Sequence, residues 1–191
     1  YKYKQNTIAL EIVEFEKLIE SQYITRSINT RAEELTNEAD AIAIRVTRTQ
    51  KLSNVALQLY GLYLKIGFVR NEKDHFFVKE FFQSSLPKYN VAELGFYEKL
   101  YLYQSYVWYH HTTQDFLHTY KYAQKWIDLF QESPEMKQFD PAIYIKGLHN
   151  LLSSLFYLSH YTRFVEVLSE LENFKLNEKN RRIHNLESIR Y

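Results

Sequence analysis

Three histidines, His110, His111 and His118, come nearest in type and spacing to a metal site. A metal site in a protein needs three or more converging ligands, which further partners hold in place. His111 and His118 lie seven residues apart and would share one face of a continuous helix. A helix break is predicted between them, however, near His111 to Gln114. We therefore expect no metal site here and no cofactor, and we interpret His111 as a polar surface residue.

Two further patterns resemble catalytic or metal-binding arrangements. Glu72 and His75 form a Glu-x-x-His unit, which di-iron helical bundles use twice, but here it occurs once, at a predicted helix start. The acidic run from Glu33 to Asp40 resembles paired catalytic carboxylates, yet such a run on an amphipathic helix is typical of its solvated face. No phosphate-binding glycine loop, nucleophile elbow or His-Glu-x-x-His motif is present. These patterns do not predict an enzyme.

The composition excludes several classes of function. The 191 residues contain no cysteine, which rules out disulfides, thiolate metal sites and cysteine nucleophiles. The formal net charge is +1, which argues against a general nucleic-acid binder, because non-specific affinity comes from clustered Lys and Arg. No apolar run approaches the roughly 20 residues that span a bilayer, so we expect no membrane partner and a cytoplasmic location.

The low content of turn residues predicts an all-α fold. Four glycines and three prolines are too few for the turns of a β-rich chain of this length. The hydrophobic periodicity predicts about nine helices with short connections, so neighbours in sequence are antiparallel. They are expected to begin near Thr7, Thr30, Leu52, Asn71, Asn90, Thr113, Asp140, Thr162 and Asn177. No linker rich in Pro, Gly or Ser divides the chain, so residues 1–191 are expected to form one domain, with a fragment of a longer array as the alternative.

Capping signals and apolar stripes support individual helices. Thr30 with Glu33 and Asn90 with Glu93 have the spacing of capping boxes, and Gly67 is a natural helix end. One apolar face of the first helix is formed by Ile8, Ile12, Phe15 and Ile19. The second helix carries a stripe suited to close packing or to pairing with another copy, formed by Ala32, Leu35, Ala39, Ile42 and Val46.

Three helix pairs between residues 51 and 174 resemble tetratricopeptide repeats. The residues that fit the repeat pattern are Leu59, Tyr63 and Gly67 in the first pair, Tyr109, Ala123 and Trp126 in the second, and Leu152, Ser153 and Phe156 in the third. The landmarks Leu59, Tyr109 and Leu152 are separated by 50 and 43 residues, against about 34 in the family. The aromatic-rich array is similar to uncharacterised Bacteroidetes proteins of this kind. The resemblance implies a bacterial protein with the fold of a right-handed α-α superhelix, that is, a tetratricopeptide-like solenoid. It also implies that Trp126 is buried between helices.

The resemblance also implies a binding surface on the concave side, which the first helix of each pair lines. Its positions would be Gln104 and His111 in the second pair and Asn150, Ser154 and Tyr157 in the third. In the first pair they would be Asn54, Leu57, Gly61 and Leu64. The chain is thus expected to be a non-enzymatic scaffold for a protein or peptide segment. A nucleic-acid-binding helical repeat and a structural module that forms homo-oligomers are the alternatives.

Overall fold

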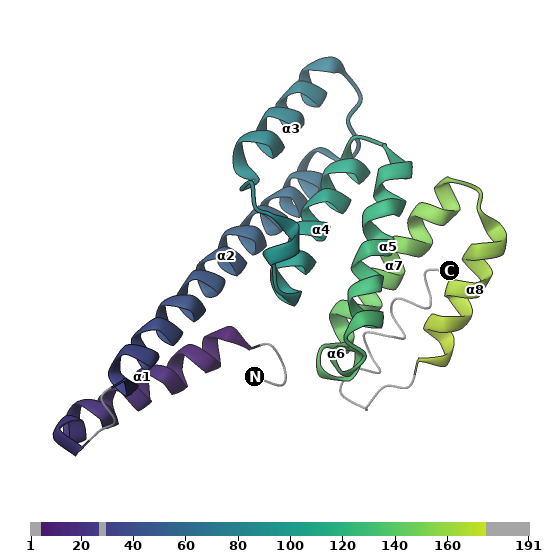
Figure 1. The fold of residues 1–191 in the computed structure, drawn as a ribbon. Helices are drawn as coiled ribbons and strands as arrows, with labels where there is room; N and C mark the ends of the chain where they lie inside the picture. The colour runs from purple at the N-terminus through teal and green to yellow at the C-terminus, as the bar shows by residue number, and fades with distance from the viewer. Residues whose placement is uncertain (1–4, 27–29, 175–191) are drawn as a thin grey trace.

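The computed structural model describes residues 5–26 and 30–174, and within them the fold consists of eight α-helices and two 3-10 turns, without a strand (Figure 1). The helices are α1 (Asn6–Tyr23), α2 (Arg31–Ile66), α3 (Glu72–Ser85), α4 (Phe96–Thr112), α5 (Phe116–Glu132), α6 (Glu135–Phe139), α7 (Pro141–Tyr157) and α8 (Tyr161–Asn173). The 3-10 turns are η1 (Ile24–Arg26) and η2 (Val91–Glu93). The all-α prediction is confirmed. The helix predicted from Asn177 lies outside the described residues.

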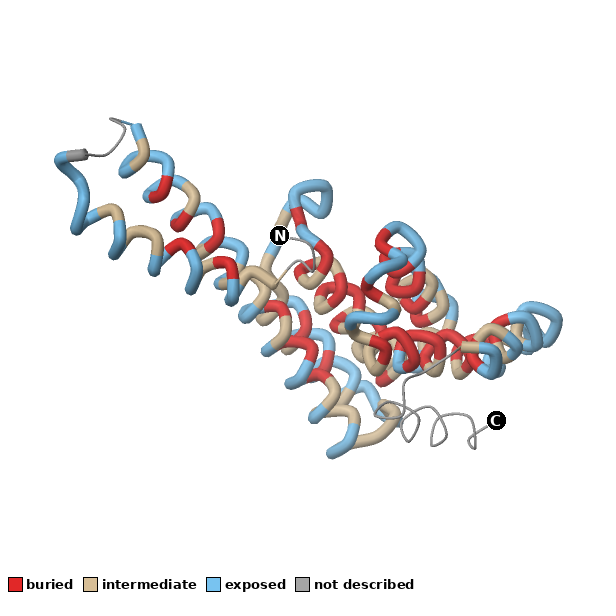
Figure 2. The backbone as a smooth tube through the Cα atoms, turned by 90° about the horizontal axis from the view of Figure 1, so that it is seen from below, coloured by how far each residue is buried: buried red, intermediate tan, exposed pale blue. Residues whose placement is uncertain are grey.

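Helix α1 and the first half of α2 form a hairpin, the arm, which projects from the rest of the molecule (Figures 1 and 2). Its small core consists of Ala9, Val13, Leu35, Ala39 and Ile42. The small Ala9 and Ala39 let the two helices approach closely, and Leu35, Ala39 and Ile42 belong to the α2 stripe predicted for packing. The apolar face predicted on α1 therefore points away from α2, and its side chains are 42–63% exposed.

Helix α2 continues without interruption for 36 residues, so the prediction that a separate helix begins near Leu52, after a break at Gln50 and Lys51, is wrong. Residues 31–60 contain no glycine or proline, and Gln50 and Lys51 are themselves good helix formers. The first half of α2 packs on α1 and the second half packs on α4, so both halves are stabilised by burial. The helix ends at Gly67, as predicted, where φ is +68°.

The main body is a stack of α4, α5, α7 and α8, with the second half of α2 against α4. Its core contains the fully buried Trp126 of α5, as expected. Gly147 of α7 lies directly against this indole, since a Cβ atom at that position would come within 2.9 Å of Trp126 Nε1. The absence of a side chain at Gly147 thus lets α5 and α7 approach closely.

The pairs α4–α5 and α7–α8 repeat one another at a spacing of 45 residues. Helix α4 spans residues 96–112 and α7 spans 141–157, while α5 begins at 116 and α8 at 161. The connecting turns have the same backbone form, because Gln114 and Ser159 both adopt positive φ, 61° and 58°. The predicted landmarks Tyr109 and Leu152 are 43 residues apart, so they are two residues out of register with this repeat.

Both turns are closed by the same pair of backbone hydrogen bonds, those of a Schellman motif. In the first, Asp115 N–H donates to the carbonyl of His110 and Gln114 N–H donates to that of His111. The second repeats these bonds 45 residues later, from His160 N–H to Leu155 and from Ser159 N–H to Phe156. Each turn therefore places the last turn of one helix beside the first turn of the next.

Helix starts follow the sequence signals only in part. Asn90 does cap a helix, but its side chain accepts from Ala92 N–H in the 3-10 turn η2 and not at the start of α4. Helix α4 begins after Gly95, whose N–H donates to the buried Glu98 carboxylate at 2.6 Å. Thr30 makes no capping hydrogen bond. The short α6 was not predicted, because five residues are too few for a periodic pattern.

Candidate functional site

Two of the five site residues predicted in the second and third helix pairs are buried within α7. Ser154 is fully buried and its hydroxyl donates to the carbonyl of Leu151 at 2.8 Å. Asn150 is also buried, and its amide donates to the carbonyl of Lys146 at 2.7 Å. Helix α7 packs on both α5 and α8, which covers these positions. Their polar groups are thus satisfied inside their own helix and offer no surface to a peptide.

The structure does bring His111 and Tyr157 together. Their ring centroids lie 6.2 Å apart, and Phe116 stacks on Tyr157 at 4.1 Å with the planes 8° apart. Burial, followed by the nearby charge of His149, lowers the pKa of His111 to about 4, so its imidazole is neutral at pH 7. Tyr157 is 46% exposed, while Gln104 and His111 are partly buried. These three residues can still contribute to a binding face.

The surrounding face is formed by the predicted first helices α2, α4 and α7. The Tyr60 and Trp108 rings lie 4.4 Å apart, and the Lys146 ammonium lies 5.2 Å from the centre of the Tyr60 ring. Leu57 and Leu64 of α2, which the resemblance assigns to the concave side, are exposed. Because the aromatic rings pack on one another, they fill most of the space between the side chains of this face.

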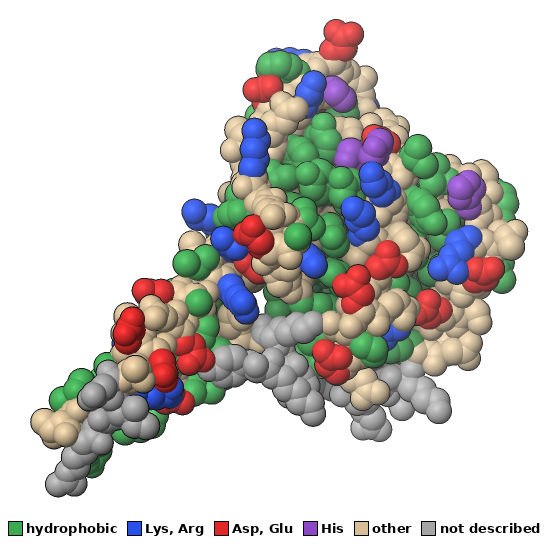
Figure 3. All heavy atoms as spheres, viewed as in Figure 1, with side chains coloured by type: hydrophobic (Ala, Val, Ile, Leu, Met, Phe, Trp, Pro, Cys, Tyr) green, Lys and Arg blue, Asp and Glu red, His purple; other side chains and the backbone are tan. Residues whose placement is uncertain are grey.

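A larger hollow lies on the opposite edge of α4, between α3 and α5, and we call it the tyrosine cleft. Its volume is about 570 Å³, within the usual range for ligand sites. It is lined by Phe82, Gln83, Leu86, Pro87, Lys88, Tyr89, Val91, Leu102, Tyr103, Tyr106, Tyr122 and Lys125. Figure 3 shows hydrophobic surface in the hollow between α3 and α5, with lysine and histidine side chains along its α5 side.

Helix α3 keeps the cleft open because it touches α4 through few side chains. Phe82 stacks on Tyr109 at 4.1 Å and meets Tyr106 edge-on at 5.2 Å. On the far wall, Tyr106 and Tyr122 stack at 4.1 Å with planes 9° apart. The Lys125 ammonium lies 5.6 Å from the centre of the Tyr122 ring. The cleft is therefore aromatic on both walls and positively charged at its rim.

The charged residues that line the cleft are Lys88 and Lys125, and no carboxylate is among the lining residues. Acidic groups do lie nearby. Burial raises the pKa of Tyr103, and the charges of Glu132 and Asp128 add to this effect. The lining itself thus favours a ligand that combines apolar or aromatic groups with a negative charge.

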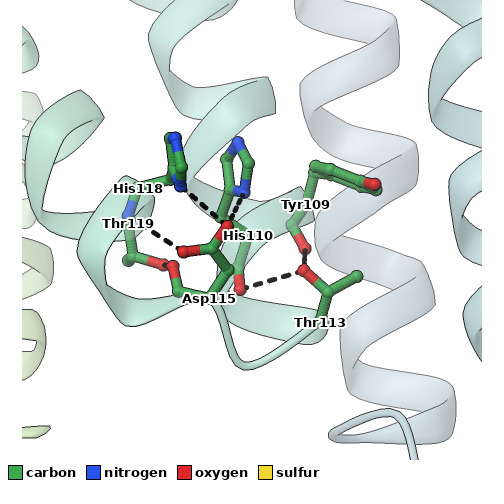
Figure 4. Close-up of polar contacts among 6 residues, drawn as sticks. All are labelled: Tyr109, His110, Thr113, Asp115, His118 and Thr119. Carbon is green, nitrogen blue, oxygen red and sulfur yellow. Dashed lines mark hydrogen bonds and ion pairs between the residues drawn. The ribbon is translucent and has the colours of Figure 1, made fainter.

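A polar cluster of His110, Asp115 and His118 closes one end of the same aromatic wall (Figure 4). The His110 ring lies parallel to that of Tyr122 at 5.7 Å and to that of His118 at 4.8 Å. Asp115 Oδ2 lies 3.3 Å from His110 Nδ1 and 2.8 Å from His118 Nδ1. Asp115 Oδ1 accepts from the backbone N–H of His118 at 3.2 Å, which caps α5.

The electrostatics of the cluster favour a neutral His110 imidazole beside the Asp115 carboxylate. Burial lowers the pKa of His110, against the opposing effect of Asp115. Burial would raise the pKa of Asp115, but hydrogen bonds from His118 and the charges of both histidines lower it below its usual range. The cluster can accept a cation without first losing a proton from His110 at pH 7.

The sequence pattern missed this cluster because it tested the wrong pair. His111, seven residues before His118, points to the α2 and α7 side, while His110 faces His118 across the turn. The missed signal was the combination of Asp115, a helix-capping residue, with a histidine on each side of the turn. In a tight antiparallel turn, such side chains converge.

Comparison of this chain with protein family models, curated proteins and solved structures finds no match. Among the described residues, none of the helices has the length and apolar character needed to cross a membrane.

Proposed function

We propose that this chain is a tetratricopeptide-like right-handed solenoid that binds a segment of another protein and has no enzymatic activity. The 45-residue recurrence of α4–α5 in α7–α8 supports a repeat architecture. The observation that carries the binding role is the tyrosine cleft, with its aromatic walls and its two lysines. The proposed ligand is an extended peptide with aromatic or apolar side chains and at least one carboxylate.

The chemistry of the cleft suits a peptide. Tyrosine supplies a large contact area with few rotatable bonds and a hydroxyl that can bond to a peptide backbone. Lys88 and Lys125 can pair with acidic side chains at the rim, where such pairs contribute specificity and association rate. The predicted face around His111 and Tyr157 is the competing surface, favoured by the exposed ring of Tyr157.

A peptide-display selection against the purified chain tests the proposal. We expect the selected peptides to be rich in aromatic and acidic residues. Lys125→Glu and Tyr106→Ala should each weaken the best peptide by about tenfold or more, as expected for a lost charge pair or aromatic anchor. Tyr157→Ala is the matched control on the predicted face and should leave the affinity unchanged.

The result of this selection decides between the tyrosine cleft, the predicted face around Tyr157 and the alternative functions. If Tyr157→Ala abolishes binding and the cleft variants retain it, the predicted face is the site and the cleft is not. If no peptide is enriched, the segment-binding proposal fails. A single-stranded oligonucleotide that binds with a steep salt dependence would instead support the nucleic-acid alternative.

Self-association through the arm is a second candidate function, favoured by the exposed apolar face of α1. Ile8 is 54% exposed and Phe15 is 63% exposed. Three residues of the α2 stripe predicted to pair with another copy, Leu35, Ala39 and Ile42, are instead buried against α1 in the arm. We therefore place the contact between copies on α1. Light scattering should show a dimer that Phe15→Glu dissociates, whereas a monomer at all concentrations would exclude this role.

A further inference from the structure

The cluster at the α4–α5 turn consists of side chains of the types that bind metal ions. We propose that His110, Asp115 and His118 bind one divalent transition-metal ion, with Zn²⁺ as the expected occupant. One ligand atom from each residue lies within 4.8 Å of the other two. Two imidazole nitrogens and a carboxylate oxygen are ligands that zinc accepts readily. This site does not depend on whether the tyrosine cleft binds a peptide.

Of the three distances between ligand atoms, one matches a tetrahedral zinc ion, one is shorter and one is longer. Bonds of about 2.0–2.1 Å to zinc place neighbouring ligand atoms roughly 3.3 Å apart. The two edges that meet at Asp115 Oδ2 measure 3.3 Å to His110 Nδ1 and 2.8 Å to His118 Nδ1. The remaining edge, between the two imidazoles, has to shorten. The His118 side chain is 47% exposed, so its ring can rotate toward the ion without disturbing the core.

The backbone holds the ligands in place before any ion binds. Asp115 is the N-cap of α5, bound to the N–H of His118, so its carboxylate already points across the turn. His110 lies in the last turn of α4 and packs against Tyr106, Tyr109 and Tyr122. The Schellman bond from Asp115 N–H to the His110 carbonyl, at 2.8 Å, fixes the distance between these two residues. A metal ion therefore has only one ligand, His118, left to order.

Binding requires a change of imidazole tautomer. In the metal-free cluster each histidine can donate an Nδ1–H to Asp115, and a metal ion would take the place of these two hydrogen atoms. Each neutral imidazole then carries its hydrogen on Nε2, and both Nδ1 lone pairs face the ion. Three protein ligands leave a fourth position for water or for a donor from a bound partner.

The test is a Zn²⁺ titration of the full chain without a polyhistidine tag, after removal of metals with a chelator. Calorimetry should report one ion per chain, and Co²⁺ in place of Zn²⁺ should give the intense visible absorption of a tetrahedral site. His118→Ala should weaken binding by roughly 100-fold, since even the loss of a residue that only supports a ligand costs 10–100-fold. His75→Ala, on the exposed surface of α3, is the matched control and should bind like the wild type.

The variants are expected to fold, so a change in Zn²⁺ affinity reports on the proposed metal site. His118 is half exposed, and its backbone N–H remains to bond Asp115, so His118→Ala keeps the α5 cap. Asp115→Asn also keeps a capping oxygen while removing the charge. Zn²⁺ should raise the melting temperature of the wild type and of His75→Ala, but not of His118→Ala. Equal Zn²⁺ affinity in wild type and His118→Ala, or no binding at all, overturns the proposal.

Discussion

The effect of replacing a helical glycine by alanine can be compared at two positions, one tightly packed and one open to solvent. Gly147 lies in α7 where a Cβ would meet Ile127 Cδ1 at 2.8 Å and Trp126 Nε1 at 2.9 Å. Gly61 lies inside α2, with nothing within 4 Å of the position of its Cβ. We therefore expect Gly147→Ala to destabilise the chain and Gly61→Ala to stabilise it.

The magnitudes follow from two terms. Replacing a helical glycine by alanine gains about 0.5–1 kcal/mol, because the unfolded chain loses conformational freedom. At Gly61 this term acts alone. At Gly147 it is opposed by overpacking, which costs about 1–3 kcal/mol in a tightly packed core, since the rigid indole of Trp126 cannot move far. The net change at Gly147 is therefore a loss of stability of up to about 2.5 kcal/mol.

Urea denaturation followed by circular dichroism at 222 nm measures both effects. The midpoint for Gly147→Ala should fall and that for Gly61→Ala should rise, with the same slope as the wild type. In thermal melts, 1 kcal/mol corresponds to about 2–4 °C for a chain of this size. The double variant should show about the sum of the two changes, because a Cβ at Gly61 meets no atom within 4 Å. If Gly147→Ala were as stabilising as Gly61→Ala, the proposed close contact between α5 and α7 would be refuted.

Three further predictions concern buried polar groups. The pKa of His111 is lowered to about 4, so between about pH 6.5 and 4 the unfolded chain binds a proton that the folded chain does not. Stability should therefore fall by about 2–3 kcal/mol as the pH drops through that window, and His111→Phe should remove this part of the slope in urea titrations. Glu98→Ala should cost about 1–2 kcal/mol in urea denaturation, because Gly95 N–H at the start of α4 loses its acceptor; an unchanged midpoint would contradict this. Tyr144→Phe should cost about 1–3 kcal/mol, since the hydroxyl donates to the Glu170 carboxylate. Glu170→Gln should cost much less in the Tyr144→Phe background than in the wild type.

Where local signals were strong, the sequence predicted the structure well. Asn71 caps α3 with its side chain on Asp74 N–H, and Gly67 ends α2 with positive φ. Both depend on residues within four positions of one another, which a single sequence displays. Pro141 likewise marks the first turn of α7.

Features set by distant parts of the chain were missed. The continuity of α2 depends on α1 and α4, which cover its two halves, and no local pattern records that. A break near His111 to Gln114 was predicted, but its form was not, because the residue with positive φ (61°) is Gln114, which carries no glycine signal. Without the form of that turn, the approach of His110 to His118 could not be predicted. Ser154 was assigned to the concave surface from the repeat resemblance. It is buried by neighbouring helices, and no local pattern in the sequence records that burial.

The continuity of α2 has a consequence for the protein's internal motions. At about 1.5 Å per residue, its 36 residues span about 54 Å and continue from the arm into the body. The arm core holds five buried residues, whereas the C-terminal half of α2 is anchored in the main stack through Leu52 and Leu59. Backbone amides near Ala39 should therefore exchange their hydrogen atoms for deuterium much faster than those near Val55. One unbroken helix would then contain two regions that open at different rates, and a ligand that clamps the arm would be detected by the slowing of only the first.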